Sequence, residues 1–121
     1  MVASLSTRIL KNRGQMLENM VFCALHRITP DIYYYRTKEN FEVDFIAILN
    51  NGEKILIQVC EDMSTQEPRT RELRALSAAM LETGLTTGYI VTESHSETIE
   101  TDYGTIRCIP APEFLAEAKF I

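Results

Sequence analysis

Two polar residues interrupt a pair of otherwise apolar segments in the stretch FEVDFIAILNNGEKILIQVCED, residues 41–62. Asp44 stands in the first segment, Gln58 stands in the second, and an Asn-Asn-Gly turn separates them. A carboxylate buried among apolar residues is costly unless it is hydrogen-bonded, paired with a cation or bound to a metal. Because oxygen ligands suit a hard cation, the two residues are candidates for binding Mg²⁺ or Mn²⁺.

The geometry of the turn decides whether these two side chains meet. A two-residue loop would put Asp44 and Gln58 on opposite faces of the sheet, whereas a three-residue loop with a left-handed Gly52 would set them directly opposite each other. In the second register Cys60 is a diagonal neighbour on the same face. The sequence is compatible with both registers. It is also compatible with the alternative that both side chains lie near strand ends and bond to backbone or water.

The apolar pattern predicts which elements position these residues. Apolar residues at helical spacing predict a helix at 12–27 that ends before Pro30, and Glu18 lies on the shoulder of its apolar stripe, from which it can reach the same sheet. Runs of strand-forming residues and turn signals predict the other elements, which are strands at 32–36, 43–49, 54–60, 88–92 and 105–109 and helices at 70–83 and 112–118. Residues 64–68 are a helix entry to the helix at 70–83, with Pro68 in the first turn. A helix between the third and fourth strands favours a crossover to a parallel neighbour, whereas the first three strands form a meander. We therefore expect an α/β fold with a mixed central sheet flanked by helices.

Length and composition limit the class of protein. The chain has 121 residues and is 45% apolar, which predicts a single domain over residues 1–121. The first residues lack a signal-peptide core, and no window approaches the roughly 18 apolar residues of a membrane span. We therefore expect a soluble, cytoplasmic protein with no membrane partner. Cys23, Cys60 and Cys108 are odd in number and widely spaced, which is typical of reduced, structural cysteines.

The net charge of −5 argues against a protein that coats nucleic acid by charge alone. A local patch can still act, because charges are screened over a distance of about 10 Å. Arg69, Arg71 and Arg74 on the predicted second long helix are candidates for contacting nucleic acid. The alternative is an ordinary solvated helix face on which these arginines pair with Glu67 and Glu72.

The order of the polar residues resembles a known superfamily. Glu18 on the first helix, "EVDF" with Asp44, and "IQVC" in the place of an E/Q-x-K tripeptide resemble the PD-(D/E)XK superfamily of metal-dependent nucleases. Their restriction-endonuclease-like core is an αβββαβ unit. More narrowly, "LEN", "YYYRTK", "RTRELRAL" and "IRCIPAPEFL" resemble the C-terminal domain, of unknown function, of a family of bacterial and archaeal AAA-type ATPases. The likeness spans nearly the whole chain from Gly14 onward.

The resemblance implies a role for each matching residue. Glu18, Asp44 and Gln58 match the metal-site positions, and Asp44, Gln58 and Cys60 match the catalytic positions, with Cys60 in the place of the usual lysine. A thiol carries no positive charge, and removing one preorganised donor typically costs on the order of 10² to 10³ in rate. Gln58 in place of a carboxylate also weakens the binding of a divalent ion. The resemblance therefore implies a degenerate nuclease site in which Mg²⁺ or Mn²⁺ binds weakly or not at all.

Three functions are compatible with such a site. The first is a nucleic-acid-recognition or regulatory module, with DNA as its ligand, related to an AAA-type ATPase. The second is an active divalent-metal-dependent DNA nuclease, a phosphodiester hydrolase in which a displaced arginine replaces the lysine. The third is a protein-interaction domain with no nucleic-acid role, whose partner is an ATPase or another protein.

Overall fold

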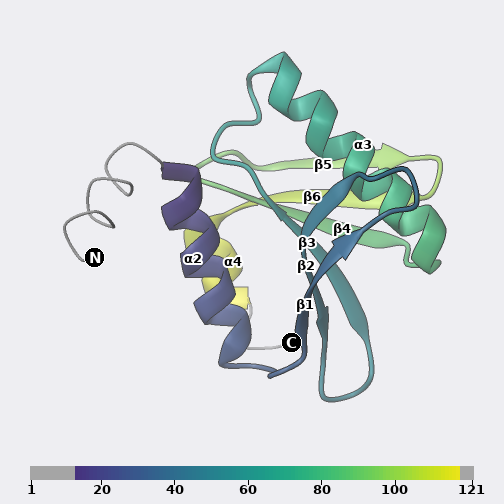
Figure 1. The fold of residues 1–121 in the computed structure, drawn as a ribbon. Helices are drawn as coiled ribbons and strands as arrows, with labels where there is room; N and C mark the ends of the chain where they lie inside the picture. Colours follow the sequence, from purple (N-terminus) through teal and green to yellow (C-terminus); the bar gives the residue numbers. More distant parts are fainter. Residues whose placement is uncertain (1–12, 118–121) are drawn as a thin grey trace.

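A computed structural model describes residues 13–117 of the chain. Its elements, in chain order, are α2 (Arg13–His26), β1 (Ile32–Arg36), β2 (Glu42–Ile48), β3 (Lys54–Val59), α3 (Gln66–Thr83), β4 (Thr87–Thr92), β5 (Glu97–Thr101), β6 (Gly104–Pro110) and α4 (Ala111–Glu117). The strands form one sheet in the order β1-β2-β3-β4-β6-β5 (Figure 1). Strands β3, β4 and β6 run parallel, and the outer pairs are antiparallel. The predicted α/β fold with a mixed sheet flanked by helices is confirmed.

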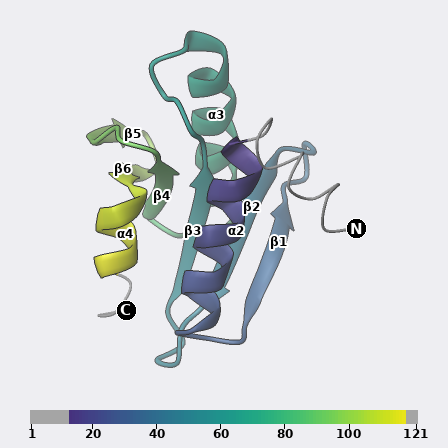
Figure 2. The ribbon, with the colours of Figure 1, turned by 90° about the vertical axis from the view of Figure 1, so that its left-hand side faces the viewer.

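Helices cover both faces of the sheet. Helices α2 and α4 lie on one face and α3 lies on the other, as two perpendicular views show (Figures 1 and 2). The first face buries a cluster that includes Val21, Phe45 and Phe114, and the second buries a cluster that includes Leu56 and Leu76. Because strand β3 is covered on both sides, its residues from the second onward are all buried, as expected for a strand inside such a sheet.

Helix α3 begins at Gln66, within the predicted helix entry at residues 64–68, and ends where predicted. Pro68 lies in its first turn, where a backbone N–H would have no helical partner and proline is therefore tolerated. Gly84 adopts the left-handed conformation with φ 75°, and its N–H donates to the carbonyl oxygen of Met80 at 2.9 Å. This is the C-terminal cap that the sequence predicts.

Strand β5 was not predicted. Its sequence, Glu-Thr-Ile-Glu-Thr, has one large apolar residue, so it carries little periodic signal. The strand forms because it pairs with β6, with Ile99 opposite Ile106. Gly104 makes the turn from β5 into β6 possible. Its φ is 145°, and a Cβ atom at this position would lie 2.1 Å from the carbonyl oxygen of Thr86.

None of the helices between residues 13 and 117 combines the length and apolar character needed to cross a membrane. All three cysteines carry free thiols. Cys23 is exposed, and Cys60 and Cys108 are buried.

Candidate functional site

The turn between β2 and β3 sets the register of the hairpin. The N–H of Leu49 donates to the carbonyl oxygen of Glu53 at 2.7 Å, and the N–H of Gly52 donates to the carbonyl oxygen of Leu49 at 2.8 Å. Gly52 has a φ of 88°. These contacts close a three-residue loop, so the register that sets Asp44 opposite Gln58 is the one that forms.

A bulge in β2 interrupts the ladder at Asp44. On the β1 side, Tyr33 pairs with Ile46 but Tyr35 pairs with Val43, so β2 contributes one extra residue at this point. On the β3 side, the regular pairs run from Ile48 opposite Lys54 to Phe45 opposite Ile57. The regular pairing of β2 with β3 therefore ends just where the polar residues Asp44 and Gln58 begin.

Side chains replace the missing ladder bonds between β2 and β3. The Oε1 atom of Gln58 accepts the N–H of Asp44 at 2.7 Å, and the Oδ2 atom of Asp44 accepts the N–H of Val59 at 2.8 Å. The Nε2 atom of Gln58 donates to the carbonyl oxygen of Glu42 at 3.0 Å. Because Gln58 is only 2% exposed, these bonds satisfy polar groups that have little access to water.

Helix α3 adds a second carboxylate, Glu72, which the sequence indicated only as an ion-pair partner of the arginines. The Nε2 atom of Gln58 also donates to Oε1 of Glu72 at 3.0 Å, and the Glu72 side chain is 13% exposed. Glu72 lies one and two turns before Leu76 and Met80, which belong to the buried stripe of α3. That helical spacing was the available signal for an inward-facing Glu72. We refer to Asp44, Gln58 and Glu72 together as the polar junction.

The two carboxyl groups of the polar junction bind protons unusually tightly. Burial raises the pKa of Asp44 to about 6, with repulsion from Glu18 and Glu42 adding to it, while the N–H of Val59 and the charge of Arg71 oppose the rise. Burial also raises the pKa of Glu72 to about 7; Arg71 lowers it, and the charge of Asp44 raises it. The guanidinium of Arg71 lies 3.8 Å from Oε2 of Glu72 and is largely exposed. It therefore compensates little of the buried negative charge.

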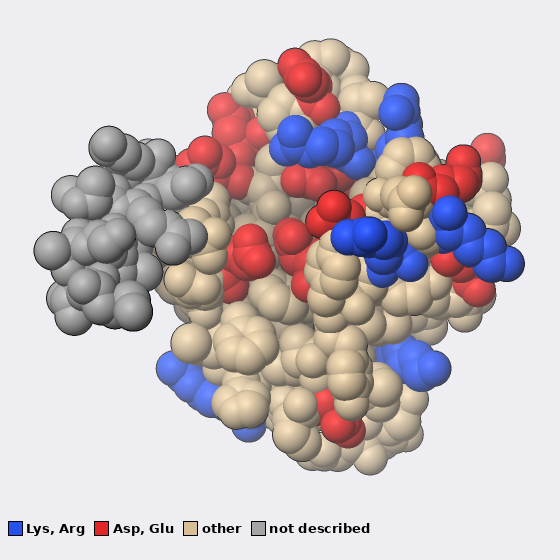
Figure 3. Space-filling model, viewed as in Figure 1, with Lys and Arg blue, Asp and Glu red and all other residues tan. Residues whose placement is uncertain are grey.

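Two adjoining cavities open beside the polar junction. The first has a volume of about 400 Å³ and is lined by Asn40, Phe41, Glu42, Asp44, Gln58, Arg71, Glu72 and Ala75. The second has a volume of about 380 Å³ and is lined by Phe41, Glu67, Thr70, Arg71 and Arg74. They share Phe41 and Arg71, so one aromatic ring and one cation separate an acidic cavity from a more basic one. Figure 3 shows Lys and Arg side chains standing around Asp and Glu side chains on this side of the molecule.

Two of the predicted metal ligands, Asp44 and Gln58, form hydrogen bonds to the backbone in this arrangement. Both Asp44 and Gln58 use an oxygen to accept a backbone N–H, and the effect of Glu18 on Asp44 is repulsion. Between residues 13 and 117, no group of three or more His, Cys, Asp or Glu side chains is close enough to hold a metal ion. Binding of Mg²⁺ or Mn²⁺ by Glu18, Asp44 and Gln58 therefore stays a prediction.

Cys60 lies in the apolar cluster under α3 and is 7% exposed. Its Sγ atom donates to the carbonyl oxygen of Asp62 at 3.5 Å, and burial is the main cause of the raised pKa of its thiol. A buried thiol with a raised pKa is a poor nucleophile. Cys60 is therefore suited to packing rather than to catalysis.

The three predicted arginines are not brought together. Arg69 makes a bidentate ion pair with Glu97, at 2.8 and 2.7 Å, and Glu97 also contacts His95 at 2.8 Å. Arg71 and Arg74 instead line the second cavity, and the guanidinium carbon of Arg74 lies 6.0 Å from the centroid of the Phe41 ring. Two of the three arginines thus remain available to a ligand.

Comparison with known proteins places the chain among domains without an established role. A family described as "Domain of unknown function (DUF4143)" matches residues 13–114. The "Uncharacterized protein MJ1544" of Methanocaldococcus jannaschii is 37% identical over 73 residues, which cover 58% of this chain and 16% of that protein. The chain thus spans a small part of the length of this relative. No solved structure matches the chain.

Proposed function

The chain belongs to the DUF4143 family, and from its polar junction we propose that it is a nuclease-like domain whose former catalytic site has become structural and which now recognises nucleic acid. Its resemblance to the PD-(D/E)XK superfamily is part of this proposal. So is its relation to AAA-type ATPases, within or beside which the domain would act as a recognition module.

The environment of Gln58 is the observation that carries the proposal. A residue that holds a catalytic metal needs a free oxygen directed at the ion. The Oε1 atom of Gln58 is instead bonded to the N–H of Asp44, and its Nε2 atom is bonded to two further acceptors. This amide joins β2, β3 and α3, which supports a structural role at the position where a ligand would be expected.

Among the described residues, no lysine lines the cavity beside Asp44, which supports the same conclusion. Cys60 is buried under α3, and the charge of Arg71 acts on Asp44 while its guanidinium lies 3.8 Å from Oε2 of Glu72. In the alternative of an active nuclease, Arg71 would have to replace the missing lysine.

Nucleic acid is the proposed ligand because Arg71 and Arg74 line an open cavity next to an aromatic ring. The net charge of −5 means that phosphate contacts are few and local. Affinity should therefore be modest and should fall as salt is raised.

The experiment combines cleavage and binding by the purified protein. Labelled single-stranded and duplex DNA are incubated at low salt with Mg²⁺ or Mn²⁺, beside an Asp44→Asn variant. We expect no cleavage by either protein and salt-sensitive binding by both. Cleavage by the wild type that Asp44→Asn abolishes would establish the active nuclease instead. Neither cleavage nor binding would favour the protein-interaction domain.

A further inference from the structure

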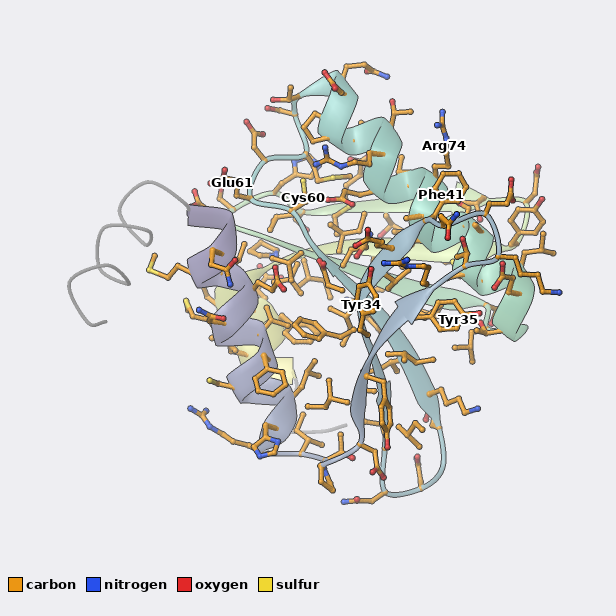
Figure 4. The ribbon with its side chains drawn as sticks, in the orientation of Figure 1. Tyr34, Tyr35, Phe41, Cys60, Glu61 and Arg74 are labelled. Atoms are coloured by element: carbon orange, nitrogen blue, oxygen red, sulfur yellow. The ribbon has the colours of Figure 1, made fainter. Side chains whose placement is uncertain are left out.

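An arginine held against an aromatic ring forms one wall of the second cavity. The guanidinium carbon of Arg74 lies 6.0 Å from the centroid of the Phe41 ring, within the distance of a cation–π contact. Figure 4 shows the two side chains next to each other where α3 passes over the segment leading into β2. Phe41 is half-buried against the core, so its position is fixed. A ring held in place in this way loses little freedom when a ligand stacks on it.

The remaining lining suits a nucleotide. Arg71 lies one helical turn before Arg74 and Thr70 supplies a hydroxyl, so one aromatic surface, two cations and one hydrogen-bonding group face the same cavity of about 380 Å³. Glu67 is the one carboxylate in this lining. On the far side of Phe41 and Arg71 lie the carboxylates of the polar junction and of Glu42. They repel phosphate, so the phosphate backbone should stay on the Arg74 side.

Only an unpaired base can use such a surface. In a duplex both faces of every internal base pair are covered by their neighbours, whereas a base in a single strand can stack on an aromatic ring or on a guanidinium plane. We infer that this domain binds single-stranded nucleic acid, with one base stacked on the wall formed by Phe41 and Arg74 and with the adjoining phosphates on Arg71 and Arg74. The inference rests on the proposed function and specifies its ligand.

A second arginine–aromatic pair lies where a single strand could continue. The guanidinium carbon of Arg36 is 5.8 Å from the centroid of the Tyr34 ring, and Tyr34 is 53% exposed. Arg36 pairs across the hairpin with Glu42, the residue that follows Phe41. Strand β1 is the edge of the sheet, so a strand leaving Phe41 can pass over this edge to Tyr34.

The test measures fluorescence anisotropy at low salt with three probes of equal length, about 20 nucleotides: oligothymidylate, a mixed-sequence duplex, and an abasic oligonucleotide that has the sugar–phosphate backbone without bases. Loss of one stacked base lowers affinity by roughly fivefold or more. We therefore expect oligothymidylate to bind at least about fivefold more tightly than the abasic strand, and more tightly than the duplex.

Variants assign the effect to this surface. Phe41→Leu should weaken oligothymidylate binding by at least about fivefold and leave the abasic strand unaffected. Arg74→Gln should weaken the binding of both probes. Arg74→Lys should restore binding of the abasic strand more fully than binding of oligothymidylate, because lysine keeps the charge but not the planar group. Tyr103→Leu is the matched control, since Tyr103 is 43% exposed in the turn between β5 and β6, and β5 is the other edge of the sheet. Thermal melting verifies that each variant is folded, and Arg74→Gln tests the surface without altering a core contact.

The outcomes separate this inference from the proposed function. Equal binding of oligothymidylate and the abasic strand, or tighter binding of the duplex that Phe41→Leu does not change, would overturn the single-strand inference and leave nucleic-acid recognition standing. Failure of all three probes to bind would overturn both. Binding of polyglutamate in their place would assign the arginines to an acidic protein.

Discussion

Replacing Glu72 by glutamine removes one titrating carboxyl group from the polar junction while keeping an oxygen that can accept the hydrogen bond from Nε2 of Gln58, now 3.0 Å from Oε1 of Glu72. The side chains have almost the same shape. The substitution therefore changes charge with little change in packing.

The magnitude follows from the pKa of Glu72, which burial raises from 4.5 to about 7. A tenfold change in proton affinity is worth about 1.4 kcal/mol, so the full effect would be about 3 kcal/mol. Two factors reduce this free energy. The Glu72 side chain is 13% exposed and so has some access to water, and its titration is coupled to that of Asp44. We expect about 1 to 2 kcal/mol.

The sign follows from proton binding. The folded protein holds a proton on Glu72 that the unfolded chain releases above its own pKa of about 4.5, so the free energy of unfolding falls as pH rises from about 5 to about 8. At pH values near 8 the wild type buries a charge that Glu72→Gln does not. The variant should therefore be more stable than the wild type by about 1 to 2 kcal/mol near pH 8 and nearly equal to it near pH 5.

Urea unfolding at several pH values measures the effect. Asp44, whose pKa is about 6, continues to titrate in the variant, so the variant should lose roughly half of the pH dependence of the wild type rather than all of it. Glu67→Gln is the control, because Glu67 is an exposed residue on the same helix and its variant should keep the full dependence. A wild type equally stable near pH 5 and pH 8 would refute the reasoning. So would a Glu72→Gln variant that is less stable near pH 8 and keeps the slope.

Three further predictions test other parts of the structure. Gln58→Leu should lower the free energy of unfolding by about 2 to 4 kcal/mol, because it leaves the N–H of Asp44 without its acceptor along with other buried polar groups; a loss below about 0.5 kcal/mol in urea unfolding would contradict it. Gly104→Ala should cost more than about 2 kcal/mol, since its Cβ would meet the carbonyl oxygen of Thr86, and an unchanged melting temperature would be evidence against this. Oligothymidylate should bind more tightly near pH 6 than near pH 8, because protonated Glu72 no longer repels phosphate. Equal affinities at the two pH values, or tighter binding near pH 8, measured by fluorescence anisotropy, would contradict this repulsion.

The hairpin was predictable in large part from local residues. The apolar runs located β2 and β3, and Gly52 indicated the left-handed turn residue that closes a three-residue loop. The choice between the two registers needed the structure, because both turns suit an Asn-Asn-Gly sequence. The bulge was not predictable, since one extra residue in a strand leaves no mark on an alternating apolar pattern.

The candidate site was only half predictable. Asp44 and Gln58 stood out because each is polar within an apolar run, whereas Glu72 lies in a helix rich in charged residues and looks like part of its solvated face. Arg69 resembled Arg71 and Arg74 in the sequence, but its ion pair is with Glu97, a residue of the strand that carried no periodic signal. The inward position of Glu72 and the ion pair of Arg69 both depend on contacts between elements, which tertiary packing sets.

The side-chain bond that Gln58 makes to the N–H of Asp44 turns one backbone amide into a reporter. The N–H of Asp44 bonds to the Gln58 side chain, so we expect its proton to exchange with solvent when that side-chain bond opens. We therefore expect its exchange rate to report on this side-chain bond. Because Phe41 lies three residues away in the same segment, the Asp44 amide signal in a nuclear magnetic resonance spectrum should respond to a ligand in the adjoining cavity while the signals of β4 and β6 stay in place.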